Sequence, residues 1–99
     1  MSLEKAKRYV ASLEERCGRM PELLGFRSQD ICTAYKQLLQ TAASLAVVCM
    51  QTGDLQSAWT MVRKAEKGEA GIQRFGLASD REWSGQIPLC IVQGFLLFK

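Results

Sequence analysis

Apolar residues recur through the first fifth of the chain at the spacing of a helical face. They stand three and four residues apart: Leu3, Ala6, Val10, Leu13 and Cys17. Lysine, arginine and glutamate occupy most of the positions between them. This period is that of an amphipathic helix, and we expect one over residues 3–17. Gly18 is expected to end it, and Pro21 prevents its resumption in register.

The strongest periodic pattern lies in the second quarter of the chain. Its apolar positions alternate intervals of four and three: Ile31, Tyr35, Leu38, Ala42, Leu45 and Cys49. The pattern predicts a helix over residues 29–52, roughly 36 Å long at the α-helical rise. From Gln37 to Gly53 no residue is charged. A helix without a charged face is contacted by neighbours on several sides, and we expect that here.

A short turn at Gly53 and Asp54 leads into a third helix. Glycine suits the end of one helix and aspartate caps the start of the next. The following apolar stripe consists of Leu55, Ala58, Trp59, Val62 and Ala65. We expect a helix over residues 55–67, stopped by Gly68 and Gly71. Because the turn is short, the second and third helices form an antiparallel hairpin.

The pattern weakens after this hairpin. Residues 69–85 contain three glycines and allow a short helix near 69–75. Residues 87–98 hold nine apolar residues in twelve, which is typical of either a buried helix or a buried strand. Pro88 is tolerated in the first turn of a helix and fits a central strand poorly, so a helix is favoured. The expected fold is all-α, a small helical bundle in one domain over residues 1–99.

Composition excludes several functional classes. The chain of 99 residues is 47% hydrophobic and 23% charged, which is too apolar for intrinsic disorder. It contains no histidine, so catalytic triads with histidine and histidine-ligated zinc are excluded. Glycine-rich phosphate loops and glycine-flanked nucleophilic serines are also missing from the sequence. We therefore expect neither an enzyme nor a bound cofactor, and we assign no catalytic residues.

Four cysteines stand at positions 17, 32, 49 and 90. No two have the C-x-x-C spacing of a zinc or redox motif, so no metal site is expected. We interpret them as reduced thiols of the core, which favours a cytoplasmic protein. The two charge-free stretches are 17 and 16 residues long and contain several polar residues. Both are shorter than the roughly 20 residues that a membrane span needs, so no membrane partner is expected.

Small residues recur within the hairpin at defined spacings. They are accompanied by two larger positions, and the set reads Ala46, Cys49, Gly53, Ala58, Val62 and Ala65. At these spacings residues 39–67 resemble a tetratricopeptide repeat. Ala42 departs from the family pattern, which has a large aromatic there, and Cys49 replaces a common tyrosine. A single repeat is too small to bury its core, so flanking helices or another chain must complete it.

The resemblance implies a module that binds proteins. In such a hairpin the first helix faces the ligand, and the corresponding positions are Gln40, Ala43, Ser44, Val47 and Met50. Their apolar character suits the apolar face of a partner helix. Trp59 and Trp83 are candidate interface anchors. Val47, Met50 and both tryptophans can equally be core residues. The expected function is that of an adaptor or scaffold, which binds a partner polypeptide or forms a homo-oligomer.

A second repeat family offers an alternative. Leu45, Gly53 and Ala58 also resemble the pentatricopeptide repeat, whose members bind single-stranded RNA. The net charge of +3 comes from 13 basic and 10 acidic residues that are interspersed along the chain. The expected ligand-facing side has no basic residues for contact with phosphates. A small RNA-binding helical-repeat protein is thus the alternative, and binding of nucleic acid is disfavoured.

Overall fold

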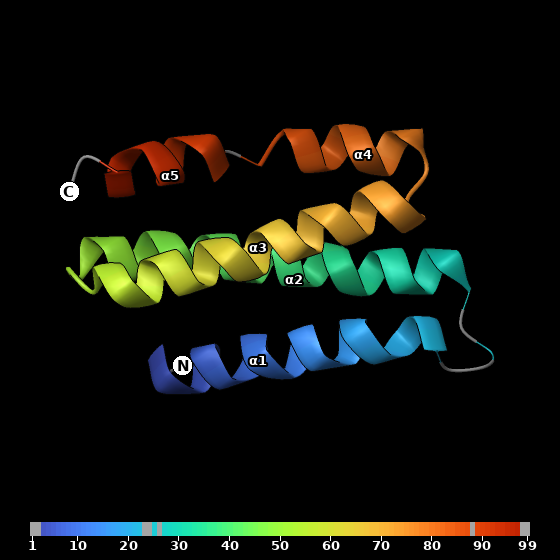
Figure 1. The fold of residues 1–99 in the computed structure, drawn as a ribbon, viewed down its shortest axis with the longest axis horizontal. Helices are drawn as coiled ribbons and strands as arrows, with labels where there is room; N and C mark the ends of the chain where they lie inside the picture. The colour runs from blue at the N-terminus through green and yellow to red at the C-terminus, as the bar shows by residue number, and fades with distance from the viewer. Residues whose placement is uncertain (1–2, 23–24, 26, 88, 98–99) are drawn as a thin grey trace.

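Three layers of helices make up the fold (Figure 1). The computed structural model describes residues 3–22, 25, 27–87 and 89–97, and every regular element among them is helical. The middle layer is the antiparallel pair α2 (Ser28–Gln51) and α3 (Leu55–Phe75). Helix α1 (Leu3–Arg19) lies on one side of this pair. On the other side α4 (Ala78–Gly85) and α5 (Leu89–Leu97) follow each other end to end. The expected all-α bundle is confirmed.

The first helix packs mainly on α2 through its apolar stripe. Val10, Leu13 and Cys17 are buried against the core. The helix passes through Gly18 and continues to Arg19, where a single 3₁₀ turn, η1 (Met20–Glu22), follows. Met20 is also buried. The helix therefore ends two residues later than the expected boundary at residue 17, because Met20 extends the buried stripe by three residues.

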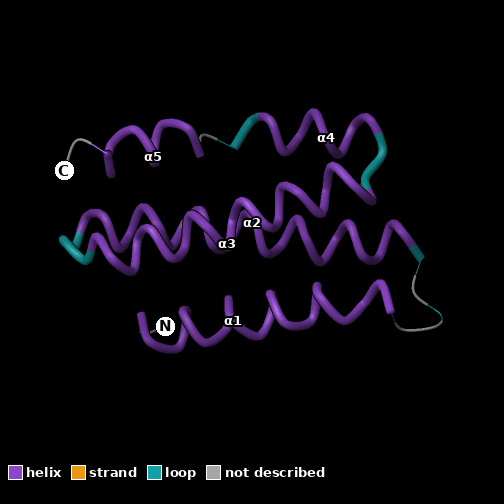
Figure 2. Tube along the Cα trace, viewed as in Figure 1, coloured by secondary structure: helices purple, strands orange, loops and turns teal. Residues whose placement is uncertain are grey.

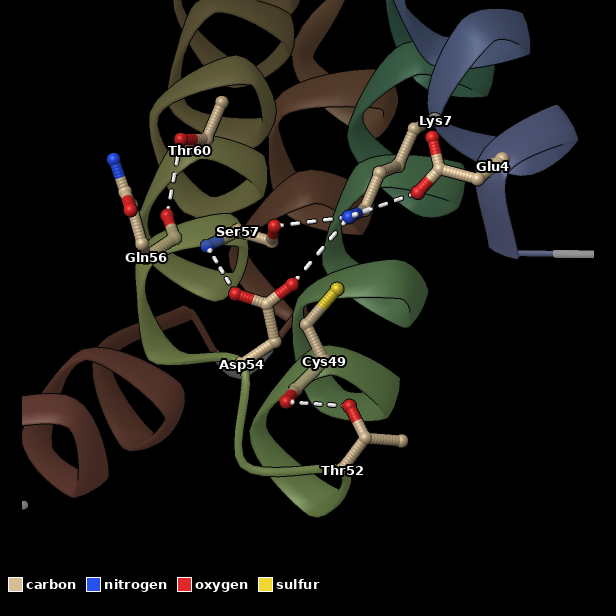
Figure 3. Close-up of polar contacts among 8 residues, drawn as sticks. All are labelled: Glu4, Lys7, Cys49, Thr52, Asp54, Gln56, Ser57 and Thr60. Atoms are coloured by element: carbon tan, nitrogen blue, oxygen red, sulfur yellow. Dashed lines mark hydrogen bonds and ion pairs between the residues drawn. The ribbon is translucent and has the colours of Figure 1, made fainter.

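The turn between α2 and α3 is built as its residues predict (Figures 2 and 3). Gly53 has a φ of +85°, a conformation that glycine adopts without strain. The Asp54 Oδ1 accepts a hydrogen bond from the Ser57 amide at 3.2 Å, which caps α3. Lys7 of α1 donates to the Ser57 hydroxyl at 2.9 Å and to the Asp54 carboxylate at 3.4 Å. One lysine thus joins the first helix to the hairpin turn.

The predicted end of the third helix at residue 67 is wrong. Helix α3 passes through Gly68 and Gly71 and ends at Phe75. A Cβ atom on Gly68 would lie 2.8 Å from the Leu39 backbone nitrogen, and one on Gly71 would lie 2.2 Å from Cγ of Tyr35. Glycine costs a helix about 1 kcal/mol relative to alanine. Here that cost is offset by the close approach of α2 and α3, which a side chain at either position would prevent.

Small side chains and one aromatic ring make the contact between α2 and α3 tight. Ala46 and Ala58 of the repeat-like set are completely buried, as are Ala42 and Ala65, and such short side chains let the two helices approach closely. Tyr35 lies over Gly71 and stacks on Phe75, with ring centroids 5.9 Å apart and planes 10° from parallel. We call this tightly packed contact between the two helices the α2–α3 seam.

Helix α4 lies in the part of the chain where the sequence pattern is weak. Its start is stabilised by Asp80, whose carboxylate accepts a hydrogen bond from the Leu77 amide at 2.9 Å. The same carboxylate pairs with Lys36 of α2. The Lys36 ammonium also lies 5.4 Å from the ring centre of Trp83. Lys36 thus links this short polar helix to α2, a contact that no periodic pattern could reveal.

The C-terminal apolar segment is a helix in its described part. Leu89, Val92 and Leu96 are buried at helical spacing, and α5 contacts both α3 and α2. The Gln93 amide donates a hydrogen bond to the Glu66 carboxylate of α3. The range expected to be helix or strand, 87–98, includes Pro88 and residue 98, which lie outside the described residues. No described helix is both long and apolar enough to span a lipid bilayer.

Candidate partner-binding groove

A groove runs between α2 and the α5 side of the bundle. Its volume is about 310 Å³. Four of the seven residues predicted to meet a partner line it together: Gln40, Ala43, Ser44 and Val47. The opposite wall consists of Ile87, just before α5, and of Leu89 and Val92 of α5. The four α2 residues stand at i, i+3, i+4 and i+7, so they share one helical face. Ala43 and Ser44 are short, which leaves the space open.

The groove is apolar and uncharged. The walls are mainly the aliphatic side chains of Val47, Ile87 and Leu89. At its open edge the Ser44 hydroxyl donates to the Gln40 backbone carbonyl at 2.9 Å, so its proton is already used within the helix. The Gln40 side chain is exposed and offers an amide donor and acceptor. This arrangement can hold aliphatic side chains and one or two neutral hydrogen bonds, but it offers nothing to balance a charge.

An uncharged exposed face continues along α2 beside the groove. Five exposed residues at intervals of three and four make up what we call the α2 outer face: Gln37, Gln40, Ser44, Val48 and Gln51. Val48 keeps 42% of its surface exposed. The expectation that neighbours contact this helix on several sides is met, since α1, α3 and the α4–α5 layer all touch it. The outer face is the side that they leave open.

The other three predicted residues lie apart from the groove. Met50 is half-buried against the core and is not among the groove-lining residues. Trp59 of α3 is half-buried next to a surface hollow of about 470 Å³ that Gln56, Thr60 and Arg63 also line. Trp83 of α4 packs against the core beside Lys36. The structure therefore assembles four of the predicted residues and disperses three.

Sequence reasoning missed the groove wall opposite α2. The apolar run from residue 87 signals burial, but it does not say which helix it meets. The pairing of Leu89 and Val92 with the α2 face depends on how α4 turns the chain back across the bundle (Figure 1). Val48 was missed for another reason: it is an apolar residue in an apolar stretch, and nothing local marks it as exposed.

The cysteine thiols of the described core have low reactivity. Cys17, Cys32 and Cys49 are buried and free. Burial raises the pKa of Cys17 to about 11 and also raises the pKa of Cys32 and of Cys49. These thiols are therefore protonated near neutral pH and are poor nucleophiles. Among the described residues, no three side chains of metal-binding type lie together.

Comparisons with known proteins give no relative from which a function could be transferred. No protein-family model, no curated protein and no solved structure matches this chain. The features of the molecule that bear on its function are therefore the uncharged groove and the α2 outer face.

Proposed function

We propose that this protein is a protein-interaction module of the adaptor or scaffold type. Its site is the α2–α5 groove together with the α2 outer face, and its ligand is an amphipathic helix of a partner polypeptide. One observation carries the proposal: an uncharged groove lies beside a helix face that is exposed and uncharged over four turns. The cores of protein interfaces are likewise depleted of charged residues.

The groove defines the chemistry of its partner. Aliphatic side chains spaced three and four residues apart on a helix can enter between Val47 and Leu89. Neutral polar side chains at the edge of that helix can exchange hydrogen bonds with the amides of Gln40 and Gln51, which are exposed. A charged side chain would lose its hydration there without gaining a counter-ion. The partner face is therefore aliphatic at its centre and uncharged at its margins.

The resemblance to a tetratricopeptide repeat supports the same surface. In such a hairpin the first helix of the unit faces the ligand, and here that helix is α2. Helix α5 covers part of this face, and the groove is the part that stays open. The RNA-binding alternative lacks similar support, because the α2 outer face has no lysine or arginine to meet a phosphate.

Selection from a displayed library of amphipathic helices tests the proposal. We expect the purified protein to enrich peptides with an uncharged aliphatic face. Val47→Glu places a carboxylate in the groove and should weaken the binding of such a peptide at least tenfold in fluorescence polarisation. Thr33→Glu is the matched control, because Thr33 is exposed on the same helix and is not among the groove-lining residues.

Three results would overturn the proposal. The first is a failure to enrich any helical peptide, and the second is an equal affinity of the V47E variant and the parent. The third comes from sedimentation velocity. A dimer of the parent that V47E converts to monomer would identify a second copy of the chain, in place of another polypeptide, as the occupant of the groove.

A cytoplasmic location belongs to the same proposal. Three buried, protonated thiols support a reducing compartment, where such cysteines stay free. Fluorescence microscopy of the tagged chain with markers for cytosol and secretory compartments tests this placement, and co-localisation with a secretory marker would contradict it.

A further inference from the structure

The wall that α2 contributes to the groove has the arrangement of a coiled-coil hole. In a coiled coil, one side chain of a helix enters a diamond of four residues on the facing helix, at positions i, i+3, i+4 and i+7. The α2 residues that line the groove stand at these intervals: Gln40, Ala43, Ser44 and Val47. We call this diamond the α2 hole. If the groove binds a helix, as the proposed function requires, the α2 hole determines which side chain of that helix enters.

The α2 hole is open at its centre because the two residues at its waist are short. Ala43 carries only a methyl group and is half-buried. The Ser44 hydroxyl is bonded to the Gln40 carbonyl at 2.9 Å, so this side chain lies back along its own helix. The larger residues, Gln40 and Val47, stand at the two ends of the diamond along the helix axis. A side chain from outside can therefore enter between them.

Helix α5 supplies a firm wall opposite the α2 hole. It runs in the same direction as α2 (Figure 1), and Leu89 and Val92 line the groove about one turn apart. Both residues are buried, and Ile87 packs against the core, so this wall is fixed by its own packing. A side chain in the α2 hole would thus meet α2 on one side and aliphatic groups of α5 on the other.

The space suits one large apolar side chain. The groove has a volume of about 310 Å³, which is larger than a cavity of ~150 Å³ that holds benzene. Leucine, methionine or phenylalanine can occupy such a space, whereas alanine would leave most of it empty and lose dispersion contacts. The lining residues are uncharged, so a lysine or glutamate would be desolvated without a counter-ion.

Two further diamonds adjoin the α2 hole along the same helix. One begins three residues earlier, at Gln37, and the other begins four residues later, at Ser44. Their members are all uncharged, and each is exposed or half-buried: Gln37, Gln40, Thr41 and Ser44, then Ser44, Val47, Val48 and Gln51. Side chains of a heptad stripe follow one another at the same intervals of three and four. A helix that crosses α2 at roughly 20° can therefore place successive stripe residues in all three diamonds.

We propose that the site selects a helix with heptad spacing and a single large apolar side chain, the anchor, which enters the α2 hole. Ala43 sets this specificity, because its methyl group leaves the room that the anchor fills. The stripe residues of the ligand on either side of the anchor are small or polar and uncharged, since glutamine, threonine and serine border the diamonds that they meet. The ligand is thus a particular kind of amphipathic helix.

A double-mutant cycle tests the proposal. The probe is the fluorescein-labelled peptide most enriched in the displayed library, and fluorescence polarisation measures its affinity. Alanine at the anchor position should weaken binding more than about tenfold, as truncation of an interface hot spot does, and alanine at any other stripe position less than about threefold. Ala43→Leu fills the α2 hole and should weaken the unaltered peptide more than about tenfold. The two changes together should cost no more than either alone, because each removes the same contact.

Thr33→Leu is the matched control. It adds the same side chain to an exposed position of α2 that does not line the groove, and it should leave the affinity within about twofold of the parent. Circular dichroism establishes that each variant is folded. If A43L does not fold, Ser44→Leu takes its place in the cycle, because it fills the same hole from an exposed position.

Equal losses at several stripe positions of the peptide would overturn this specificity. An unchanged affinity of A43L, or additive losses in the cycle, would overturn it as well. In each of these cases the parent still binds the peptide and V47E still weakens it, so the proposed function would stand. Failure to enrich any helix in the selection would instead remove the function and the specificity together, and that result is seen before any variant is made.

Discussion

Replacement of Gly68 by alanine should destabilise the protein, although it gives the helix a better residue. In an exposed helix this change would stabilise by about 1 kcal/mol. Here the new Cβ would lie 2.8 Å from the Leu39 backbone nitrogen and 3.0 Å from its Cα atom. Ordinary van der Waals contact begins at 3.4 Å. The two helices would therefore have to separate locally, since a backbone cannot rotate out of the way as a side chain can.

The expected magnitude follows from these two opposing effects. Overpacking of a tight interior typically costs about 1–3 kcal/mol, and a clash with backbone belongs to the upper part of that range. Subtracting the helical gain of about 1 kcal/mol leaves a net loss of about 1–2 kcal/mol. For a chain of this size each kcal/mol lowers the melting temperature by roughly 4–8 °C.

Urea unfolding followed by circular dichroism at 222 nm measures the effect. Gly18→Ala is the matched control, because Gly18 is also helical but its Cβ would meet no described atom within 4 Å. We expect G18A to be more stable than the parent by about 0.5–1 kcal/mol. If G68A were as stable as G18A, the reasoning that the α2–α3 seam depends on direct backbone contact would be refuted.

Three further results are expected. The hydrogen bond from Lys36 lowers the pKa of Asp80. The stabilisation by the Asp80 carboxylate is therefore complete above the pKa of an unfolded aspartate, about 3.9, and is lost as pH falls through the lowered pKa. Asp80→Asn should flatten the pH dependence of the unfolding free energy in that acid range, and an unchanged slope would contradict this. The Cys17 thiol, with a pKa of about 11, should be alkylated by iodoacetamide at pH 8 far more slowly in the native chain than in urea, as peptide mass spectrometry can measure; equal rates would refute its burial. Lys7→Met removes the hydrogen bond to Ser57 and should accelerate hydrogen exchange in α1 while that of α2 stays unchanged, and equal acceleration in both helices would be inconsistent with a local role.

Much of the fold could be predicted because the apolar residues of an amphipathic helix recur in the sequence every three or four positions. The stripes that end at Cys17 and Cys49 gave helix limits within two residues of those observed. The error at Gly68 has a different origin. The expectation that Gly68 ends the helix rests on the backbone freedom of glycine. In the structure the lack of a side chain matters instead, because it lets α3 approach the backbone of Leu39. That use of glycine depends on a residue 29 positions away, Leu39, and no local pattern contains it.

The candidate site could be predicted only in part, for a related reason. Gln40, Ala43, Ser44 and Val47 share a helical face, and any α2 helix brings them together. Their opposite wall requires the path of α4, which is short and mostly polar and is positioned by Lys36, by the packing of Trp83 and by the buried Ser84. The hollow of about 630 Å³ between α1 and α3 was not predicted at all. Ala11 of one helix and Ala70 of the other line it, and only the three-dimensional arrangement shows that they face the same space.

The tightness of the seam also governs how the molecule can respond to a ligand. Two helices that interlock through glycine and a wedged tyrosine cannot slide past one another, so they move as one rigid body. The outer helices pack on this body through apolar side chains such as Leu13 and Val92, and polar contacts of Lys7 and Lys36 add to that packing. Binding of a ligand would then displace an outer layer, either α1 or α4 with α5, by a small amount. A ligand on one side of the bundle could affect the other side only through the rigid α2–α3 pair.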